Sequence, residues 1–173
     1  VADRTAVGTL TVPVDYADPQ GPTLELRVAR HTANPDQRIG VLATNNGGPG
    51  AAASTMALNA TSWFPEDITE RFDVVSWDPR GTGESGASVD CIDDAEYDQF
   101  FAEPDLTPED DAERQHLADV AQDFATRCVE RVQHLTSIGT NNTARDLDAI
   151  RQALGEPQLS YFGFSYGSEL GGV

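Results

Sequence analysis

A pentapeptide of the form Gly-x-Ser-x-Gly, at residues 163–167, constrains the fold of this chain more than any other feature. The apolar, aromatic-rich segment 159–162 precedes it and has the composition of a β-strand. The start of a helix follows directly at residues 168–170. A strand that turns sharply into a helix at such a motif strains the serine backbone and projects its hydroxyl above the sheet. The motif therefore predicts a nucleophile elbow centred on Ser165.

The residue after this serine has a predicted role of its own. The backbone amide of Tyr166, at the start of the helix, would face a developing oxyanion. A glycine-flanked serine in an ordinary turn is the alternative interpretation of the same motif. We favour the elbow because strand, turn and helix occur in the required order.

The composition indicates a folded domain that does not bind phosphate backbones. The 173 residues are 39% hydrophobic, which is ordinary for a chain with a core. The net charge is −18, with eleven arginines and no lysine, and this disfavours nucleic acids and anionic lipid surfaces. No apolar run is long enough to span a membrane. We expect neither a nucleic-acid partner nor a membrane span.

Both ends of the sequence lead us to expect a piece of a longer protein. The first residue is Val1 and Met56 is the only methionine, so we expect that residues were removed in front. Only eight residues follow Ser165, and the helix after the elbow is cut within its first turns, which is no domain boundary.

The two cysteines, Cys91 and Cys128, lie 37 positions apart. This spacing fits neither a zinc ligand cluster nor a Cys-x-x-Cys redox pair. An even number of cysteines in a processed chain indicates an oxidising compartment and favours one disulfide. Two buried free thiols are the alternative. We assign no metal site and no cofactor.

Strand patterns dominate the first half of the chain. Apolar and polar side chains alternate along residues 9–14 and 23–30. This pattern predicts a hairpin with one solvent-exposed face. Residues 39–44 and 72–77 are apolar runs, as expected of strands covered on both faces in a parallel sheet. We therefore expect a sheet that changes from an antiparallel edge to a buried parallel centre.

A glycine-rich loop, Asn45-Asn46-Gly47-Gly48-Pro49-Gly50, leaves the first of these buried strands. Its backbone amides can point at a ligand because no side chain blocks the approach. We interpret it as half of an oxyanion hole. A phosphate-binding loop would need a Lys-Ser/Thr pair or a Gly-x-Gly-x-x-Gly pattern, and neither is present. A plain tight turn is the remaining alternative.

A second serine, Ser85, lies among glycines in the loop after residues 72–77. Its surroundings lack the closing glycine, and an acidic segment rather than a helix follows. We therefore predict no second elbow there. We interpret Asp78 and Arg80 as structural partners that pin this loop.

We predict an acidic helical insert from about residue 87 to 135, because thirteen Asp or Glu lie between positions 90 and 123. Thr107 as cap, Pro108 in the first turn and acidic residues 109–111 predict the start of its main helix. We interpret the charge as a solvated surface; the alternative is a field that attracts the cationic end of a substrate. The predicted inward face of the helix consists of Leu117, Val120, Ala121, Phe124, Cys128, Val132 and Leu135.

A further helix connects the insert to the elbow strand. Asn141, Asn142 or Thr143 is its predicted cap, and Gly155 and Pro157 end it. The alternation of strands and helices along the chain predicts an α/β fold with right-handed crossovers and with its sites at the carboxyl ends of neighbouring strands. The predicted inward face of this helix consists of Ala144, Leu147, Ile150 and Leu154.

Five motifs together carry a family resemblance. The chain is similar to the N-terminal half of an α/β hydrolase of the proline iminopeptidase and tripeptidyl aminopeptidase family of secreted bacterial serine exopeptidases. The resemblance covers nearly all 173 residues. Asn46 and the three alanines after the glycine loop depart from the family pattern. The motifs lie at residues 11–16, 45–50, 78–85, 143–151 and 163–167.

The resemblance implies an α/β-hydrolase fold, a largely parallel sheet with antiparallel N-terminal strands that is incomplete at the C-terminus. It implies Ser165 as nucleophile and the backbone amides of Gly48 and Tyr166 as oxyanion donors. We also predict that Gly47 binds substrate. It also implies paired cysteines in the insert, which supports a bond between Cys91 and Cys128.

In this interpretation residues 1–173 are the N-terminal part of one catalytic domain. The remaining strands, a cap and the Asp and His of a triad are expected beyond residue 173. His31, His116 and His134 all precede Ser165, and we assign none of them as its base.

The predicted function is a serine hydrolase that cleaves peptide bonds near a free N-terminus, as an aminopeptidase of tripeptidyl or prolyl type, through an acyl-enzyme. An esterase or small-molecule amidase on the same fold is one alternative, and a non-catalytic hydrolase-like binding protein is another. The expected partners are a peptide or small acyl substrate and the C-terminal remainder of the hydrolase, possibly as a separate chain. The expected location is secreted or at the cell envelope.

Overall fold

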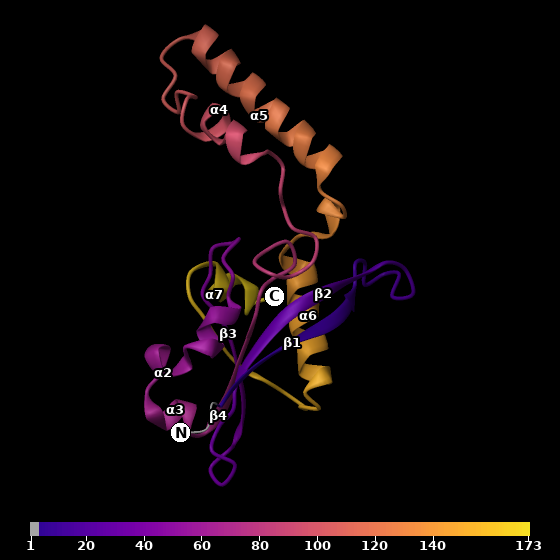
Figure 1. Cartoon of the computed structure of the whole chain (residues 1–173), viewed down its shortest axis with the longest axis vertical. Helices are drawn as coiled ribbons and strands as arrows, with labels where there is room; N and C mark the ends of the chain where they lie inside the picture. The colour runs from indigo at the N-terminus through magenta and orange to yellow at the C-terminus, as the bar shows by residue number, and fades with distance from the viewer. Residues whose placement is uncertain (1–3) are drawn as a thin grey trace. The chain divides into compact units, whose positions relative to one another are not determined.

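The computed structural model describes residues 4–173 and divides them into two compact units (Figure 1). The first unit comprises residues 4–87 and 136–173, and the second comprises Ser88–Leu135. The second unit spans nearly the same residues as the predicted acidic insert. No helix in the described part of the chain combines the length and the apolar character that crossing a membrane requires.

The first unit is built on a five-stranded sheet of order β1-β2-β4-β3-β5. β2 pairs antiparallel with both β1 and β4, whereas β3 pairs in parallel with both β4 and β5. The predicted change from an antiparallel N-terminal edge to a parallel centre is confirmed. The strands are β1 (Thr5–Pro13), β2 (Thr23–His31), β3 (Gly40–Asn45), β4 (Phe72–Trp77) and β5 (Ser160–Gly163).

The apolar sequences of β3 and β4 explain why these strands form the buried centre of the sheet. The length of the edge strand β1 is explained by its pairing with β2. Every residue of β3 and β4 after the first is buried, as expected of strands covered on both faces. β1 begins at Thr5, earlier than the predicted start at residue 9, because β2 pairs with it along its whole length from Thr23 to His31. The weak alternation before residue 9 gave no signal of this pairing.

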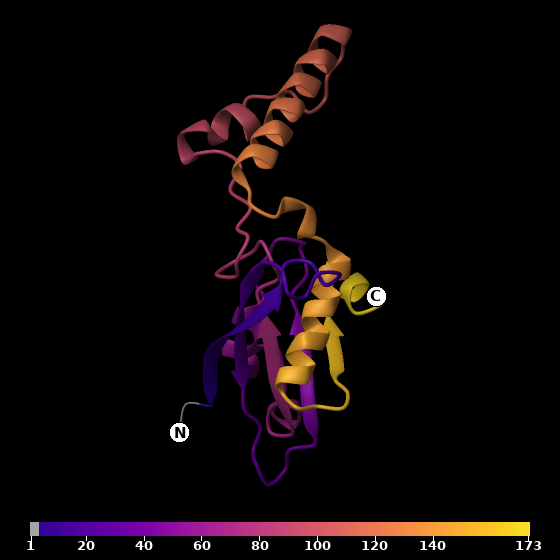
Figure 2. The ribbon, with the colours of Figure 1, turned by 90° about the vertical axis from the view of Figure 1, so that its right-hand side faces the viewer.

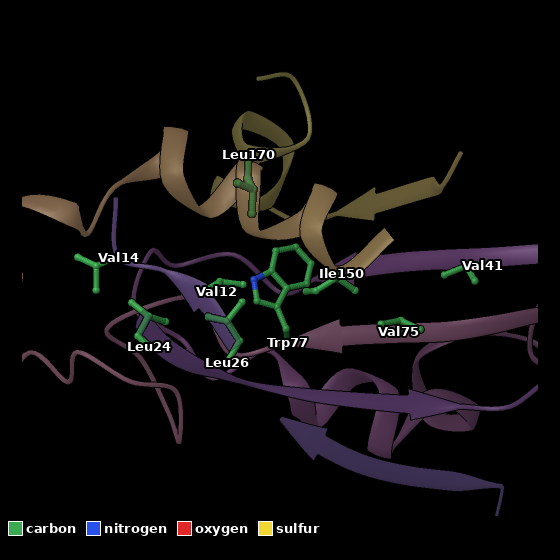
Figure 3. Close-up of a cluster of buried hydrophobic side chains, with 9 residues drawn as sticks. All are labelled: Val12, Val14, Leu24, Leu26, Val41, Val75, Trp77, Ile150 and Leu170. Carbon is green, nitrogen blue, oxygen red and sulfur yellow. The ribbon is translucent and has the colours of Figure 1, made fainter. Parts of the chain in front are cut away.

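Helices cover both faces of the sheet. Val74 and Val75 are neighbours on β4 and point to opposite faces. Val74 packs with alanines of the short helices α1 (Ser54–Leu58) and α2 (Ala60–Trp63). Val75 belongs to the larger cluster on the other face (Figure 3). A third short helix, α3 (Glu66–Thr69), precedes β4.

The larger cluster is closed by two helices from the end of the chain. Helix α6 (Thr140–Ala153) crosses one face of the sheet (Figure 2), and Ile150 on it lies beside Trp77 (Figure 3). Helix α7 (Tyr166–Leu170) adds Leu170. All three side chains are at most 2% exposed. The predicted inward face of α6 therefore does face the core.

The predicted cap of α6 is wrong. The helix begins at Thr140 after Gly139, directly behind the turn η2 (Leu135–Ser137). Asn142 and Thr143 lie inside the first turn, where their side chains donate back to the carbonyls of Ser137 and Gly139. These bonds tie the first turn to the carbonyls before it, whereas a capping side chain would accept from the amides of the first turn.

A buried ion pair joins α6 to the loop after β4. Arg80 and Asp146 have fully buried side chains, and the Arg80 Nε donates to Asp146 Oδ2 at 2.8 Å. Tyr16 donates its hydroxyl to the same carboxylate at 2.8 Å. Burial and the charge of Asp146 raise the pKa of Tyr16, so this hydroxyl stays protonated. Arg80 thus pins its loop, as the sequence predicted.

The second unit consists of the turn η1 (Asp94–Glu96) and the helices α4 (Tyr97–Phe101) and α5 (Asp111–Arg131). The predicted cap of α5 at Thr107 is wrong. Asp110 caps the helix, because its side chain accepts from the amide of Glu113 while the Glu113 carboxylate accepts from Asp110 in return. Thr107 instead donates to Asp105 in the preceding turn.

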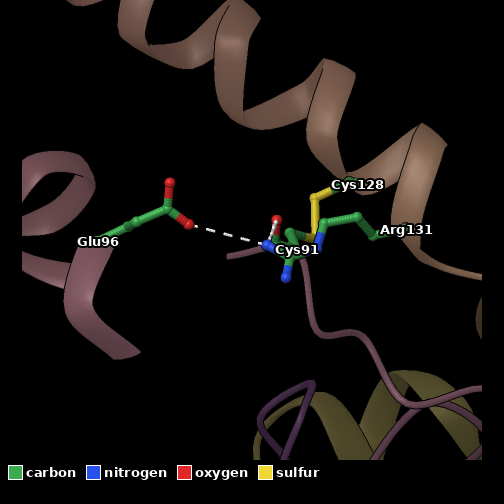
Figure 4. The surroundings of a disulfide bond; sticks show 4 residues. All are labelled: Cys91, Glu96, Cys128 and Arg131. Carbon is green, nitrogen blue, oxygen red and sulfur yellow. Dashed lines mark hydrogen bonds and ion pairs between the residues drawn. A yellow bond between two sulfur atoms is a disulfide. The ribbon is translucent and has the colours of Figure 1, made fainter. Parts of the chain in front are cut away.

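The core of the second unit is small. Only Cys128 is buried along α5, and Ala121, which was predicted to face inward, is exposed. The predicted disulfide between Cys91 and Cys128 is present (Figure 4). Arg131 lies beside it and donates to the Cys91 carbonyl at 3.3 Å. The cross-link therefore supplies order that so few buried side chains cannot supply.

We expect the double variant Cys91→Ser/Cys128→Ser to lose roughly 3 to 4 kcal/mol of unfolding free energy in the second unit, because the unfolded loop is no longer constrained. Hydrogen exchange of the α5 amides measures this loss, and Ala121→Ser on the same helix is the matched control. Two free thiols titrated in the unfolded, unreduced natural protein would contradict the account.

Candidate active site

Ser165 lies at the turn between β5 and α7, as the sequence predicted. Its φ of 49° and ψ of −123° are an unusual conformation for a residue with a side chain. The residue is exposed. Strained backbone of this kind persists only where surrounding structure imposes it, and it concentrates at functional sites.

The two glycines of the motif are required by close packing. A Cβ atom at Gly163 would lie 2.5 Å from the carbonyl carbon of Gly167. A Cβ atom at Gly167 would lie 2.9 Å from the carbonyl oxygen of Asn45, at the end of β3. Both distances are shorter than real Cβ contacts, so the helix can follow the strand this closely only with glycine at both positions.

Backbone hydrogen bonds hold the turn, and they do not use the amide of Tyr166. The amide of Gly167 donates to Phe164 O at 2.7 Å, and that of Ser168 donates to Ser165 O at 2.9 Å. Neither bond uses the amide of Tyr166, the first residue of α7. As a first-turn amide it has no carbonyl partner within its own helix.

Tyr161 braces the same helix from the strand. Its hydroxyl donates to the carbonyl of Gly167 at 2.8 Å. Burial, with a smaller contribution from Tyr166, raises the pKa of Tyr161 to about 12. The phenol therefore remains a donor at neutral pH, and the geometry of the turn does not depend on its ionisation.

The glycine-rich loop lies directly against the elbow. Gly47 and Gly48 have φ values of +90° and +124°, which favour glycine. A Cβ atom at Gly47 would lie 2.6 Å from Phe164 O and 3.0 Å from the Cβ of Ser165. The two motifs that were predicted separately from sequence therefore meet at one place.

Asn45 is a site residue that the sequence analysis missed. It is fully buried at the end of β3, and its carbonyl accepts from the amide of Phe164 at 3.0 Å. Its side-chain Oδ1 accepts from the amide of Gly47 at 2.8 Å. The Gly47 amide is thus already engaged, and Gly48 is the next amide along the loop. A polar residue at the end of an otherwise apolar strand was the available signal.

Asp78 fixes the start of helix α1, which follows the glycine-rich loop after residues 51–53. Its side chain is 1% exposed and accepts from the amide of Ser54, the first residue of α1, at 2.9 Å. Its second oxygen accepts from the amide of Glu84 at 3.0 Å. Asp78 and Arg80 thus have the structural role predicted for both, but each bonds to other groups and the predicted partnership between them is wrong.

Ser85 has no free hydroxyl to offer as a nucleophile. It is 5% exposed, its Oγ donates to Asp78 O at 2.6 Å, and it accepts from the amide of Arg27 at 2.9 Å. These bonds tie the loop to β2, which supports the prediction that no second elbow forms here.

The first unit brings no histidine to Ser165 among its described residues. His31 ends β2 and pairs with Val74 toward the amino end of β4, whereas the elbow follows the carboxyl end of β5. His116 and His134 belong to the second unit. The described residues therefore bring Ser165 and the glycine-rich loop together, without a histidine of the first unit beside them.

An aromatic surface beside the elbow was also missed. Trp63 and Phe164 have ring centroids 5.8 Å apart, and Phe162 contacts both Phe164 at 4.9 Å and Phe64 at 5.6 Å. Trp63, Phe162 and Phe164 are 46%, 41% and 41% exposed. An apolar surface from α2 and from the end of β5 thus lies next to the elbow that carries Ser165.

Comparison with known proteins gives one family match. A family model described as the alpha/beta hydrolase fold matches residues 42–172. This range begins in β3 and includes the glycine-rich loop, the second unit and the elbow.

Several curated relatives are similar along most of this chain. Serine protease Hip1 of Mycobacterium tuberculosis is 41% identical over 169 residues, which cover 95% of this chain and 32% of the relative. A tripeptidyl aminopeptidase of Streptomyces lividans is 39% identical over 173 residues, which cover 96% of this chain and 32% of the relative. Carboxylesterase B of M. tuberculosis is 44% identical over 156 residues, which cover 87% of this chain and 29% of the relative. The chain thus spans about a third of the length of these relatives.

We expect Gly167→Ala to lower the rate at which Ser165 reacts with a fluorophosphonate by about 100-fold, because the new Cβ pushes α7 away from Asn45 and displaces the nucleophile and the amide beside it. Gly139→Ala is the matched control, since a Cβ there has nothing within 4 Å. Equal labelling rates in the two variants would show that the elbow tolerates a side chain at this point.

Proposed function

This chain belongs to the α/β-hydrolase fold family, and we propose that it is the N-terminal part of a serine hydrolase with Ser165 as its nucleophile. The observation that carries the proposal is the exposed serine in strained backbone between a strand and a helix. The contact between Gly47 and this turn supports it, because a glycine loop against the nucleophile is the arrangement that acyl transfer needs.

The proposed reaction begins with attack of Ser165 Oγ on a carbonyl carbon while a base takes the hydroxyl proton. The carbonyl oxygen becomes an oxyanion and accepts from the amides of Gly48 and Tyr166. Collapse of the tetrahedral species returns the proton to the leaving group and gives an acyl-enzyme, which water then hydrolyses. The base and its carboxylate partner are expected after residue 173, in the order usual for this fold.

Peptides with a free N-terminus are the proposed substrates. The relatives named serine protease and tripeptidyl aminopeptidase support cleavage of peptide bonds. The relative named carboxylesterase supports an ester substrate as the second candidate. Trp63 and Phe164 offer an apolar surface for a side chain or acyl group next to the nucleophile. A non-catalytic binding protein is disfavoured, because the strain at Ser165 serves no purpose without acyl transfer.

We propose residues 1–173 as part of a single catalytic domain in which Ser88–Leu135 is an insert. The relatives carry the matching region within one longer chain, so they give no support to a separate C-terminal polypeptide. β5 lies at the edge of the described sheet, which leaves room for a further strand. The disulfide favours a secreted or cell-envelope location.

We expect a fluorophosphonate probe to label Ser165 in the full-length polypeptide and Ser165→Ala to abolish turnover, because the covalent route is lost with the hydroxyl. Mass spectrometry of the labelled peptide identifies the site, and Ser168→Ala in the same helix is the control. Labelling at Ser85, or undiminished turnover of Ser165→Ala, would refute the assignment.

Residues 1–173 expressed alone should be inactive and prone to association, because β5 exposes an unpaired edge beside Phe162 and Phe164 and no histidine follows Ser165. Turnover of aminoacyl, peptidyl and simple ester chromogenic substrates, with the oligomeric state from light scattering, tests both points. A soluble monomer that hydrolyses any of these substrates would contradict the proposal.

A further inference from the structure

A groove lies within the second unit, between the segment that carries Cys91 and the two helices. Its volume is about 240 Å³. The rings of Tyr97, Phe101 and Phe124 line one side, with centroids 4.9 Å apart for the first pair and 5.4 Å for the second. Val89 and Ile92 line it from the other segment. The groove is therefore mainly apolar inside.

Its aromatic side chains are open to solvent. Tyr97 is 58% exposed and Phe101 is 53% exposed, and Val89 at the edge of the groove is 46% exposed. Phe100, the neighbour of Phe101, is buried instead and has the guanidinium of Arg127 over its ring. The helix thus already uses one aromatic residue for its own core and presents two others outward. Contiguous exposed apolar surface of this kind marks an interaction site.

The rim of the groove is negatively charged. Asp90, Asp93 and Asp94 line it and are exposed. Asp93 is paired with Arg131 at 2.6 Å, whereas Asp90 and Asp94 form no salt bridge with any described residue. The unit as a whole carries fourteen acidic residues against three arginines. An anionic rim around an aromatic floor complements a ligand that is both cationic and apolar.

We propose that this groove binds a cationic amphipathic peptide segment. Aliphatic or aromatic side chains of the peptide lie on Tyr97 and Phe101, and its arginine or lysine side chains pair with Asp90 and Asp94. The interior of the groove supplies apolar contact area. The negative net charge of the unit attracts positively charged peptides and disfavours negatively charged ones. This binding goes beyond the hydrolase activity and does not depend on Ser165.

The test measures fluorescence anisotropy of a labelled peptide of alternating arginine and leucine, with a blocked amino terminus, on the full-length polypeptide after Ser165 has been phosphonylated. The blocked terminus and the occupied serine keep the peptide out of the proposed active site. We expect saturable binding that weakens as salt is raised, and no binding of the same peptide with glutamate in place of arginine.

Two groove variants and one matched control locate the binding. Asp90→Asn/Asp94→Asn should weaken affinity about 3- to 10-fold, and Phe101→Ser by about tenfold or more. Asp119→Asn/Glu130→Gln removes the same charge from α5 outside the groove and should leave affinity within about twofold. Thiol titration and thermal unfolding verify that each variant keeps its disulfide and fold.

Three outcomes overturn the proposal. Equal weakening in the control variant would mean that the overall field, and not this groove, attracts the peptide. Binding that survives Phe101→Ser and the aspartate variant would place it elsewhere. Absence of binding to the full-length polypeptide would mean that the groove is covered or unsuited to such a ligand. In each case labelling of Ser165 and turnover of small substrates remain separately measurable, so the hydrolase proposal stands or falls on its own.

Discussion

The backbone conformation at Ser165 depends on glycine at three nearby positions, where any side chain would collide with the turn. Its strained conformation helps to lead the chain from β5 into α7 across only Phe164 and Ser165, and three glycines allow this. Gly163 and Gly167 let the helix approach the strand, and Gly47 lets the loop from β3 approach the serine. A single methyl group at any of these points would collide with backbone or with Ser165 itself. The position of Ser165 therefore requires glycine at all three positions.

That geometry is supported from beneath by buried polar groups at the ends of the strands. Asn45 ends β3 and binds both the elbow and the glycine-rich loop. Asp78 follows β4 and binds the start of α1 and the next loop. Arg80 reaches Asp146 on α6 with both side chains out of water, so losing either partner would leave an uncompensated charge. A buried polar residue at the end of β3 and another just after β4 thus each hold a loop near the site.

Local patterns in the sequence predicted much of this. A few consecutive residues suffice to predict β4 from its apolar run and β2 from its alternation. The same holds for the elbow, because its motif is tied to one backbone geometry. The starts of β1, α5 and α6 were placed wrongly. Pairing with β2 extends β1, and the reciprocal cap of Asp110 and Glu113 starts α5. Helix α6 begins after Gly139, which has no side chain to form a cap, so no capping residue marks this start in the sequence. The aromatic surface at Trp63 and the bond between Asn45 and Phe164 were missed because both are contacts between segments distant in sequence.

The central claim is that Ser165 and the amides of Gly48 and Tyr166 form one acyl-transfer site. A crystal structure of the full-length polypeptide after reaction with a fluorophosphonate tests it most directly, because the phosphonyl oxygen stands in for the oxyanion. The account predicts phosphorus bonded to Ser165 Oγ and its oxygen within hydrogen-bond distance of both amides. An adduct whose oxygen points to solvent, with neither amide within reach, would contradict it.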